Sequence, residues 1–293
     1  MIVAGPAALP PMRWRDHELR WGAATHVMAI VNITPDSFSG DGLAGDPAEA
    51  VSVALRAVAD GANLLDLGAE STRPGHVPIS AEEECDRLLP VLLALRPRTD
   101  AVVSVDTSKA AVAAAALAAG ADLINDVRGF VADPEMAQVV AAAGIPAVVM
   151  HDVPPEPGVD LMTSITRELS RRLDQAVSAG VSWEHLIVDP GFGFGKDWRQ
   201  NLDLLRRLGE LRVLGRPILA GTSRKSTIGR VLGLAENDRL EGTAATVSLA
   251  IAGGADIVRV HDVRAMARVA RMTDAVVRGA PAEARTWPGG PLG

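Results

Sequence analysis

The chain has a single cysteine, no tyrosine, and few other aromatic residues: five tryptophans and four phenylalanines among 293 residues. The lone Cys85 excludes an intramolecular disulfide framework and a zinc cluster of cysteines. It suits a reducing cytosol, so we expect a cytoplasmic location. With so few aromatics, the core must be packed from small and branched aliphatic side chains.

Long apolar runs and basic runs are also missing. No stretch reaches 18 apolar residues free of charge, and the apolar residues 1–11 lack a basic segment, so neither a membrane span nor a secretion signal is indicated. The 29 basic and 36 acidic residues give a net charge of −7, without a basic run interleaved with aromatics. We therefore expect neither a membrane nor a nucleic acid as partner.

Apolar residues are nevertheless plentiful. Hydrophobic residues make up 48% of the chain and charged residues 22%, a composition typical of a globular protein with a sizeable core. A chain of 293 residues could hold two domains, but α/β barrels of this size fold as one.

One unit repeats along the chain: a short β-branched run, then polar or glycine-containing residues, then a stretch rich in Ala and Leu. The predicted strands are residues 26–33, 63–67, 101–105, 122–125, 147–150, 185–188, 217–220 and 256–260. Their starts are about 20 to 40 residues apart, the length that a βα unit needs when successive strands run parallel. The pattern predicts a single α/β domain, a (β/α)8 TIM barrel over residues 25–278. We expect a short hairpin within residues 1–24, under the barrel, and a frayed tail over 279–293.

Helix boundaries carry recognisable signals. Asp46-Pro47 and Asp133-Pro134 each predict an N-cap followed by proline, and Ser80 with Glu83 fits a capping box. Five glycines at the ends of Ala-rich stretches predict left-handed C-caps: Gly61, Gly120, Gly144, Gly180 and Gly254.

Polar residues gather after the predicted strands, whereas the opposite turns are mostly Gly, Ala and Pro. The polar positions are residues 32–39, 70–75, 106, 125–126, 151, 189–196, 223–226 and 259–262. In a (β/α)8 barrel these loops meet at the carboxyl ends of the strands, where active sites lie. The asymmetry therefore indicates a small-molecule enzyme.

Two of these loops could bind an anion. Residues 70–75 place the guanidinium of Arg73 beside Pro74, where it could grip phosphate oxygens in a bidentate fashion; a solvated loop is the alternative. Residues 221–226 enter a helix whose free amides favour an anion, and Ser226 is the expected N-cap of that helix.

The last predicted strand ends in a third basic feature. Arg259 and His261 alternate along the extended chain, so both side chains should face the barrel mouth as a cationic pair. Together with Arg73 they indicate a phosphate or pyrophosphate subsite. A buried structural arginine is the alternative for Arg259.

Two carboxylates and an amide should form the pocket floor: Asp106, Asn125 and Asp189. Such a set fits a heterocycle with several N–H donors and ring acceptors. A glycosidase would also use two carboxylates, but sugar sites add more aromatics.

Flat apolar surfaces should accompany this floor. Phe192 and Phe194 in the glycine-rich segment 189–196 could stack on a flat ligand, and Met150 could pack against it. His151 alone is more often structural than catalytic.

Several segments, taken in order across residues 25–278, resemble dihydropteroate synthase. They are residues 32–39, 70–75, 104–107, 124–126, 189–196, 223–226 and 259–262. The resemblance implies condensation of 6-hydroxymethyl-7,8-dihydropterin pyrophosphate with p-aminobenzoate, in folate biosynthesis, with release of pyrophosphate. It also implies magnesium as cofactor, a homodimer and a sulfonamide target.

The resemblance also assigns roles residue by residue. The pterin is held by Asp106, Asn125, Asp189 and Lys225, with Met150 against it. The pyrophosphate is held by Thr72, Arg73, Arg259 and His261, and magnesium contacts Asn32. The p-aminobenzoate is framed by Phe38, Pro74, Phe194 and Ser226. Catalysis is assigned to Arg73, Lys225, Arg259 and His261.

The sequence departs from the family pattern twice, at Gly40-Asp41 in the first loop and in residues 152–155 after His151. Two alternatives remain. A methyltetrahydrofolate:corrinoid methyltransferase shares the pterin floor but would not need Arg73 and Ser226. A non-catalytic pterin-binding paralogue should show damaged first and second loops, and here both are essentially intact.

Overall fold

The computed structural model describes residues 9–33, 47–71 and 77–279. Within these residues eight parallel strands form one sheet, in the spatial order β8-β7-β6-β5-β4-β3-β10-β9. The strands are β3 (His26–Asn32), β4 (Leu64–Gly68), β5 (Val102–Asp106), β6 (Leu123–Asp126), β7 (Ala147–Met150), β8 (Leu186–Asp189), β9 (Leu219–Ala220) and β10 (Ile257–Val260). A parallel bridge between Val188 and Ile218 joins the two edges, so the sheet closes into a barrel. The predicted TIM barrel is confirmed.

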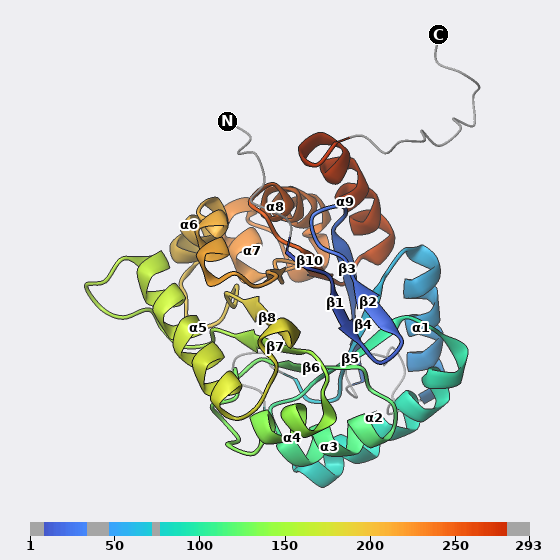
Figure 1. Cartoon of the computed structure of the whole chain (residues 1–293). Coiled ribbons are helices and arrows are strands. Elements are labelled where there is room, and N and C mark those ends of the chain that lie inside the picture. The colour runs from blue at the N-terminus through green and yellow to red at the C-terminus, as the bar shows by residue number, and fades with distance from the viewer. Residues whose placement is uncertain (1–8, 34–46, 72–76, 280–293) are drawn as a thin grey trace, which may run out of the picture.

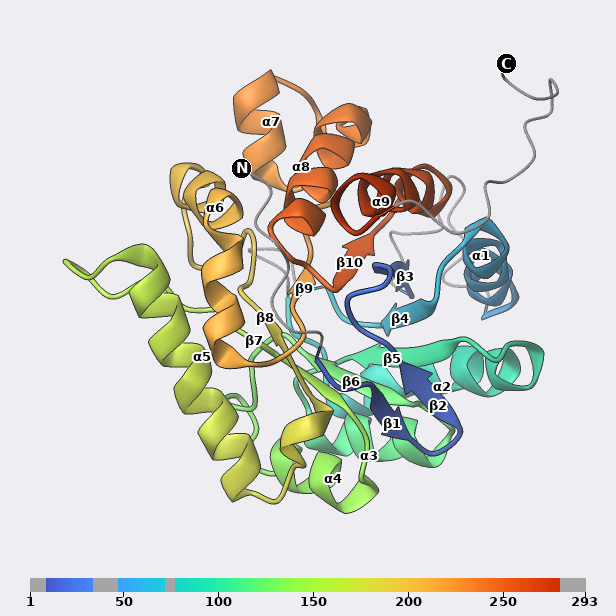
Figure 2. The ribbon, with the colours of Figure 1, turned by 45° about the horizontal axis from the view of Figure 1, so that its top comes forward.

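Helices surround the barrel (Figures 1 and 2). They are α1 (Pro47–Asp60), α2 (Ala81–Leu95), α3 (Ala110–Ala118), α4 (Met136–Ala143), α5 (Leu161–Ser178), α6 (Trp198–Arg206), α7 (Ser226–Leu232), α8 (Leu240–Ala252) and α9 (Val263–Val277). Short 3-10 turns lie at η1 (Arg96–Arg98), η2 (Trp183–His185), η3 (Leu208–Leu214) and η4 (Glu236–Asp238). In the described part of the chain, no helix has the length and apolarity needed to cross a bilayer.

The expected hairpin is present as β1 (Met12–Trp14) and β2 (His17–Leu19), paired antiparallel. It packs at the amino-terminal end of the barrel, opposite the polar loops (Figure 1). His17 lies 3.2 Å from Asp122, and Arg15 donates to the Ala121 carbonyl at 3.0 Å. Because Asp122 precedes β6, the hairpin is fastened to the starts of the strands.

Most helix signals are confirmed, and two need correction. Ser80 caps α2 by accepting from the amide of Glu83, and all five predicted C-cap glycines have positive φ. Asp133 does not cap α4, because that helix begins at Met136; its carboxylate instead accepts from the amides of Glu135 and Ala110. Ser226 is the first residue of α7 and makes no capping bond, since Lys225 occupies the N-cap position. Asp46 lies outside the described residues.

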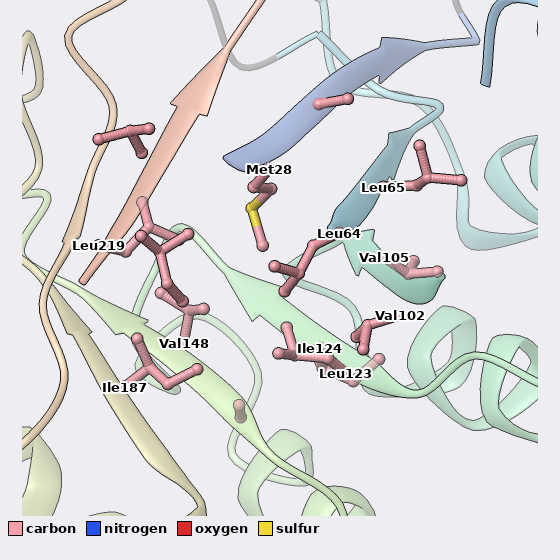
Figure 3. Close-up of a cluster of buried hydrophobic side chains, with 14 of the residues drawn as sticks. Met28, Leu64, Leu65, Val102, Val105, Leu123, Ile124, Val148, Ile187 and Leu219 are labelled. Atoms are coloured by element: carbon pink, nitrogen blue, oxygen red, sulfur yellow. The ribbon is translucent and has the colours of Figure 1, made fainter. Parts of the chain in front are cut away.

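The barrel interior is built on the two-residue alternation of strands. Met28, Leu64, Val148 and Leu219 are buried between the strands, whereas Leu65 lies on the side of β4 that faces the helices (Figure 3). Each fully buried aliphatic side chain of this size contributes about 1.5 to 3 kcal/mol. The same alternation brings Asp66 and Ser104 above this apolar layer and the strand-end residues Asp106 and Asn125 above them. Polar chemistry is therefore confined to the carboxyl half of the barrel.

Candidate active site

The predicted floor residues come together at the carboxyl ends of the strands. Asp106 ends β5 and is the direct register partner of Asn125 in β6. Asp189 ends β8 and pairs in register with Met150, the last residue of β7. Asp106, Asn125 and Asp189 are all buried, at 7%, 2% and 6% exposure, so each must satisfy its polar atoms within the pocket or with a ligand.

An arginine and a second carboxylate link this floor. Arg259 in β10 donates from Nε to Asp66 at 2.6 Å and from Nη2 to Asp106 at 2.8 Å. Asp66 in β4 also accepts from Ser104 Oγ at 2.6 Å and from Asn125 Nδ2 at 2.9 Å. Sequence reasoning missed Asp66, and it placed Arg259 at the pyrophosphate, with a buried structural arginine as the alternative. In the structure Arg259 is joined to the floor through Asp66 and Asp106, and its role at the pyrophosphate stays a prediction.

Opposing effects act on the pKa values of the carboxylates in the floor. Burial raises the pKa of Asp106, and the Arg259 guanidinium opposes that rise. Burial likewise raises the pKa of Asp189, against the hydrogen bond that its Oδ1 accepts from the amide of Gly191 at 2.7 Å. A ligand that donates hydrogen bonds to these two groups would stabilise their charged forms.

A lysine and an aromatic ring lie side by side at the pocket. Lys225 precedes α7, and its Nζ lies 4.4 Å from the centroid of the Phe194 ring. Burial, followed by the nearby Arg259, lowers the pKa of Lys225 to about 8, although Asp189 and Asp106 act in the opposite direction. The lysine therefore holds its proton at neutral pH but gives it up more easily than a solvated lysine.

His261 follows β10 and is not the cation that the sequence suggested. Burial, with Arg224 and Arg259 nearby, lowers its pKa to about 3, so the imidazole is neutral at pH 7. Its Nδ1 lies 3.0 Å from Ser223 Oγ. Arg224 forms a bidentate ion pair with Asp262 and has φ of 55°, a left-handed conformation that is uncommon for arginine. The expected cationic pair is therefore one cation, Arg259, and one neutral donor or acceptor, His261.

A buried lysine, Lys196, donates hydrogen bonds to backbone carbonyls of the glycine-rich segment after β8. Lys196 Nζ lies 2.9 Å from His151 Nδ1 and donates to the carbonyls of Gly191 and Phe194. Burial lowers the pKa of Lys196 to about 7. His151 is fully buried, which fits its structural interpretation.

The two phenylalanines of this segment differ in their surroundings. Phe192 is only 4% exposed and belongs to the hydrophobic core, so the prediction that both phenylalanines stack on a ligand is wrong for Phe192. Phe194 is half-buried beside Lys225 and remains the aromatic candidate.

The other predicted residues divide into two groups. Asn32 ends β3, where its Oδ1 and Asp106 Oδ2 each lie 4.0 Å from the position that a Cβ on Gly68 would take. Ser226 is exposed at the start of α7. Four predicted residues lie outside the described residues: Phe38, Thr72, Arg73 and Pro74. Their predicted roles stay predictions.

Comparison with known proteins shows the family to which this chain belongs. A family model described as "Pterin binding enzyme" matches residues 28–261. The dihydropteroate synthase of Clostridium beijerinckii is 44% identical over 268 residues, covering 91% of this chain and 100% of the relative. That of Bacillus subtilis is 44% identical over 259 residues, covering 88% and 91%. This chain belongs to the dihydropteroate synthase family.

Solved structures of dihydropteroate synthases have the same fold. The enzyme from Clostridium difficile, crystallised in the presence of pteroic acid, superimposes with a TM-score of 0.84 at 46% identity, covering 88% of this chain and 98% of that one. The Xanthomonas albilineans enzyme in complex with 7,8-dihydropteroate gives a TM-score of 0.83 at 39% identity, covering 91% and 98%. The structural similarity therefore extends over nearly the full length of both relatives and supports the family assignment.

Proposed function

We propose that this protein is a dihydropteroate synthase, which joins 6-hydroxymethyl-7,8-dihydropterin pyrophosphate to p-aminobenzoate and releases pyrophosphate. The observation that carries the proposal is the floor at which Asp106, Asn125 and Asp189 come together with Arg259 and Lys225. Carboxylates accept from ring and amino N–H groups, while Asn125 both donates and accepts, as a flat pterin ring requires. Membership of the dihydropteroate synthase family supports the same reaction.

The other groups around the floor suit the remaining parts of the reaction. Phe194 offers a flat aromatic surface, and Met150 offers a polarisable thioether that can pack against a flat ring. Arg259 and His261, with Arg73 and Thr72 from the second loop, supply donors for pyrophosphate. Phe194 and Ser226, with Phe38 and Pro74, would frame the p-aminobenzoate.

Magnesium is part of the proposal, with Asn32 as its protein contact. Within the described residues, no cluster of three His, Cys, Asp or Glu side chains could hold a metal ion. A single amide oxygen at the pocket edge still fits magnesium, which keeps several waters and binds substrate phosphates. When bound, the ion would help neutralise charge on the pyrophosphate.

We expect the carbon–oxygen bond to break before the amine attacks. An aromatic amine is a weak nucleophile, whereas the dihydropterin ring can donate electron density to its exocyclic methylene. Arg259 and His261 would stabilise the departing pyrophosphate, and Asp106 and Asp189 would stabilise the pterin cation left behind. Bridge-to-nonbridge oxygen scrambling in labelled substrate, without p-aminobenzoate, would support this order. Absence of both scrambling and pyrophosphate release until the amine is added would favour a concerted displacement.

The function itself is tested by assaying the purified protein for dihydropteroate with both substrates and magnesium. The Asp189→Ala variant, matched by an exposed Asp174→Ala control on α5, should lose pterin affinity by roughly 10- to 150-fold, because a hydrogen bond to a charged group contributes about 1.5 to 3 kcal/mol. Pterin binding without product formation would instead indicate a non-catalytic paralogue.

We also propose a homodimer and a cytoplasmic location. Leu249 on α8 and Met272 and Val276 on α9 are 58%, 66% and 60% exposed on helices that pack against each other. Exposed apolar side chains on two adjacent helices suit association with a second copy. Light scattering should give twice the 30.6 kDa chain mass, and Met272→Glu should shift it towards the monomer. The single cysteine supports a reducing compartment.

A further inference from the structure

Asp66 is a buried carboxylate in the middle of β4 that no ligand can reach directly. Its exposure is 0%, and it lies one layer below the strand ends that form the pocket. Three donors converge on it: the Ser104 hydroxyl on Oδ1, and Asn125 Nδ2 and Arg259 Nε on Oδ2. Two of these donors, Asn125 and Arg259, belong to the pterin floor.

The contact with Asp66 decides which way the amide of Asn125 faces. A charged carboxylate only accepts, so the group at 2.9 Å from Asp66 Oδ2 must be the NH2 of Asn125. The carbonyl oxygen of Asn125 then points to the other side of the amide. Without Asp66 the amide could turn over and exchange its acceptor for a donor.

The same oxygen fixes the guanidinium of Arg259. Nε donates to Asp66 and Nη2 to Asp106, so two carboxylates on neighbouring strands hold the planar group at two points. Nη1 is not engaged by either carboxylate. A planar guanidinium held at two of its nitrogens keeps a fixed plane, so its remaining nitrogen, Nη1, is presented in one direction only.

We propose that Asp66 is a positioning residue for pterin recognition: it sets the amide orientation of Asn125 and the plane of Arg259 through one shared oxygen. The inference rests on the proposed function. Its consequence is that Asp66 and Asn125 act as one unit, so that the effects of removing them do not multiply.

A double-mutant cycle tests this coupling. Calorimetric titration with the dihydropterin alcohol, which lacks pyrophosphate, would be done on Asp66→Ala, Asn125→Ala and the double variant. Asp66→Ala should weaken binding roughly 10- to 100-fold, and Asn125→Ala should then cost little more in that background. Ser104→Ala, which removes only the bond to the other oxygen of Asp66, should stay within about threefold of the parent.

Asp66→Asn is a second variant for the same binding measurement, to be used if Asp66→Ala does not fold. An asparagine oxygen in the place of Oδ2 keeps the shape and both acceptor contacts but loses the charge, so pterin affinity should fall by roughly 3- to 10-fold, less than in Asp66→Ala. Unchanged affinity in the Asp66 variants that fold, or penalties of Asp66 and Asn125 that multiply fully, would overturn the proposal.

A ligand-free measurement separates this proposal from the proposed function. In protein labelled with 15N-asparagine, the side-chain amide signal of Asn125, identified by its loss in Asn125→Ala, should exchange slowly in the parent and in Ser104→Ala. It should exchange measurably faster in Asp66→Asn, because a neutral amide oxygen accepts the hydrogen bond more weakly than a carboxylate. If the parent binds no pterin, the proposed function fails, while unchanged exchange in Asp66→Asn removes the positioning role whether or not pterin binds.

Discussion

Ser223 and His261 hold each other through two contacts: Ser223 Oγ accepts from the backbone amide of His261 at 3.2 Å and lies 3.0 Å from its Nδ1. The buried hydroxyl must still donate its own hydrogen, and among the described residues Nδ1 is the acceptor within reach. We expect the hydroxyl to donate to Nδ1, which places the hydrogen of the neutral imidazole on Nε2. His261 thus presents an N–H donor, suited to an anionic oxygen, without carrying a charge.

We predict that His261 stays neutral, with its proton on Nε2, from pH 5 to 8. Its folded pKa of about 3 lies below this window, so lowering the pH to 5 does not charge it. The 15N shifts of the labelled imidazole report the tautomer. Ser223→Ala should produce a mixture of tautomers, whereas a titration midpoint near 6.5 in the parent would contradict the prediction.

Pterin binding should weaken as the pH rises above 8. Because the pKa of Lys225 is lowered to about 8, its ammonium group is present below that pH and is lost above it. If the ammonium is required, affinity for the dihydropterin alcohol should fall about 30-fold between pH 7 and 9.5. Calorimetry at several pH values measures this profile.

Lys225→Arg is the matched control for this profile. Arginine stays charged throughout the window, so its affinity, though lower at pH 7, should hardly change with pH. Titration of the ligand itself would affect both proteins alike. Identical slopes for the parent and Lys225→Arg would show that Lys225 is not the titrating group.

Gly191→Ala should disrupt the pocket, whereas Gly144→Ala should not. Both glycines have left-handed φ, 70° and 62°, so the backbone strain alone should destabilise each variant by about 1 kcal/mol. A Cβ at Gly191 would lie 2.0 Å from the carbonyl oxygen of His151, while one at Gly144 meets nothing within 4 Å. Only Gly191→Ala should therefore displace the loop and weaken pterin binding, by at least about tenfold. Equal binding by the two variants would show that the loop tolerates the shift.

The strands could be predicted from the sequence because a parallel barrel buries both faces of each strand, which gives continuous β-branched runs. The predicted range 217–220 shows the limit, since the structure assigns only Leu219–Ala220 to β9 and leaves Ile218 in an isolated bridge. Asp133 shows another limit. Its signal for a helix start was real, but its carboxylate accepts from Ala110 in a different helix, a contact that local sequence does not encode.

The site was predictable at the strand ends but not one layer below them. Asp66 lies between Leu65 and Leu67 and looks like part of an apolar run. The signal that could have found it is alternation: Asp66 is two residues before Gly68, on the face of β4 that points into the barrel. The burial of Phe192 could not be predicted in the same way, because nothing in the glycine-rich segment distinguishes it from Phe194. Phe192 is buried because it packs against the hydrophobic core, a tertiary contact that the local sequence does not encode.

The last prediction concerns stability at the end of the barrel opposite the pocket. Asp274 in α9 accepts from the backbone amide and the hydroxyl of Thr25, each at 2.7 Å, and from Arg278 Nε at 2.7 Å. Asp274→Ala leaves these three donors without that acceptor next to the start of β3, so the free energy of unfolding should fall by about 3 kcal/mol. Asp174→Ala, an exposed carboxylate on α5, should change it by less than about 0.5 kcal/mol. Urea denaturation measures both values, and turnover at 25 °C should equal that of the parent because Asp274 is far from the carboxyl ends of the strands. Equal stability of the two variants would mean that Asp274 does not fasten α9 to the barrel.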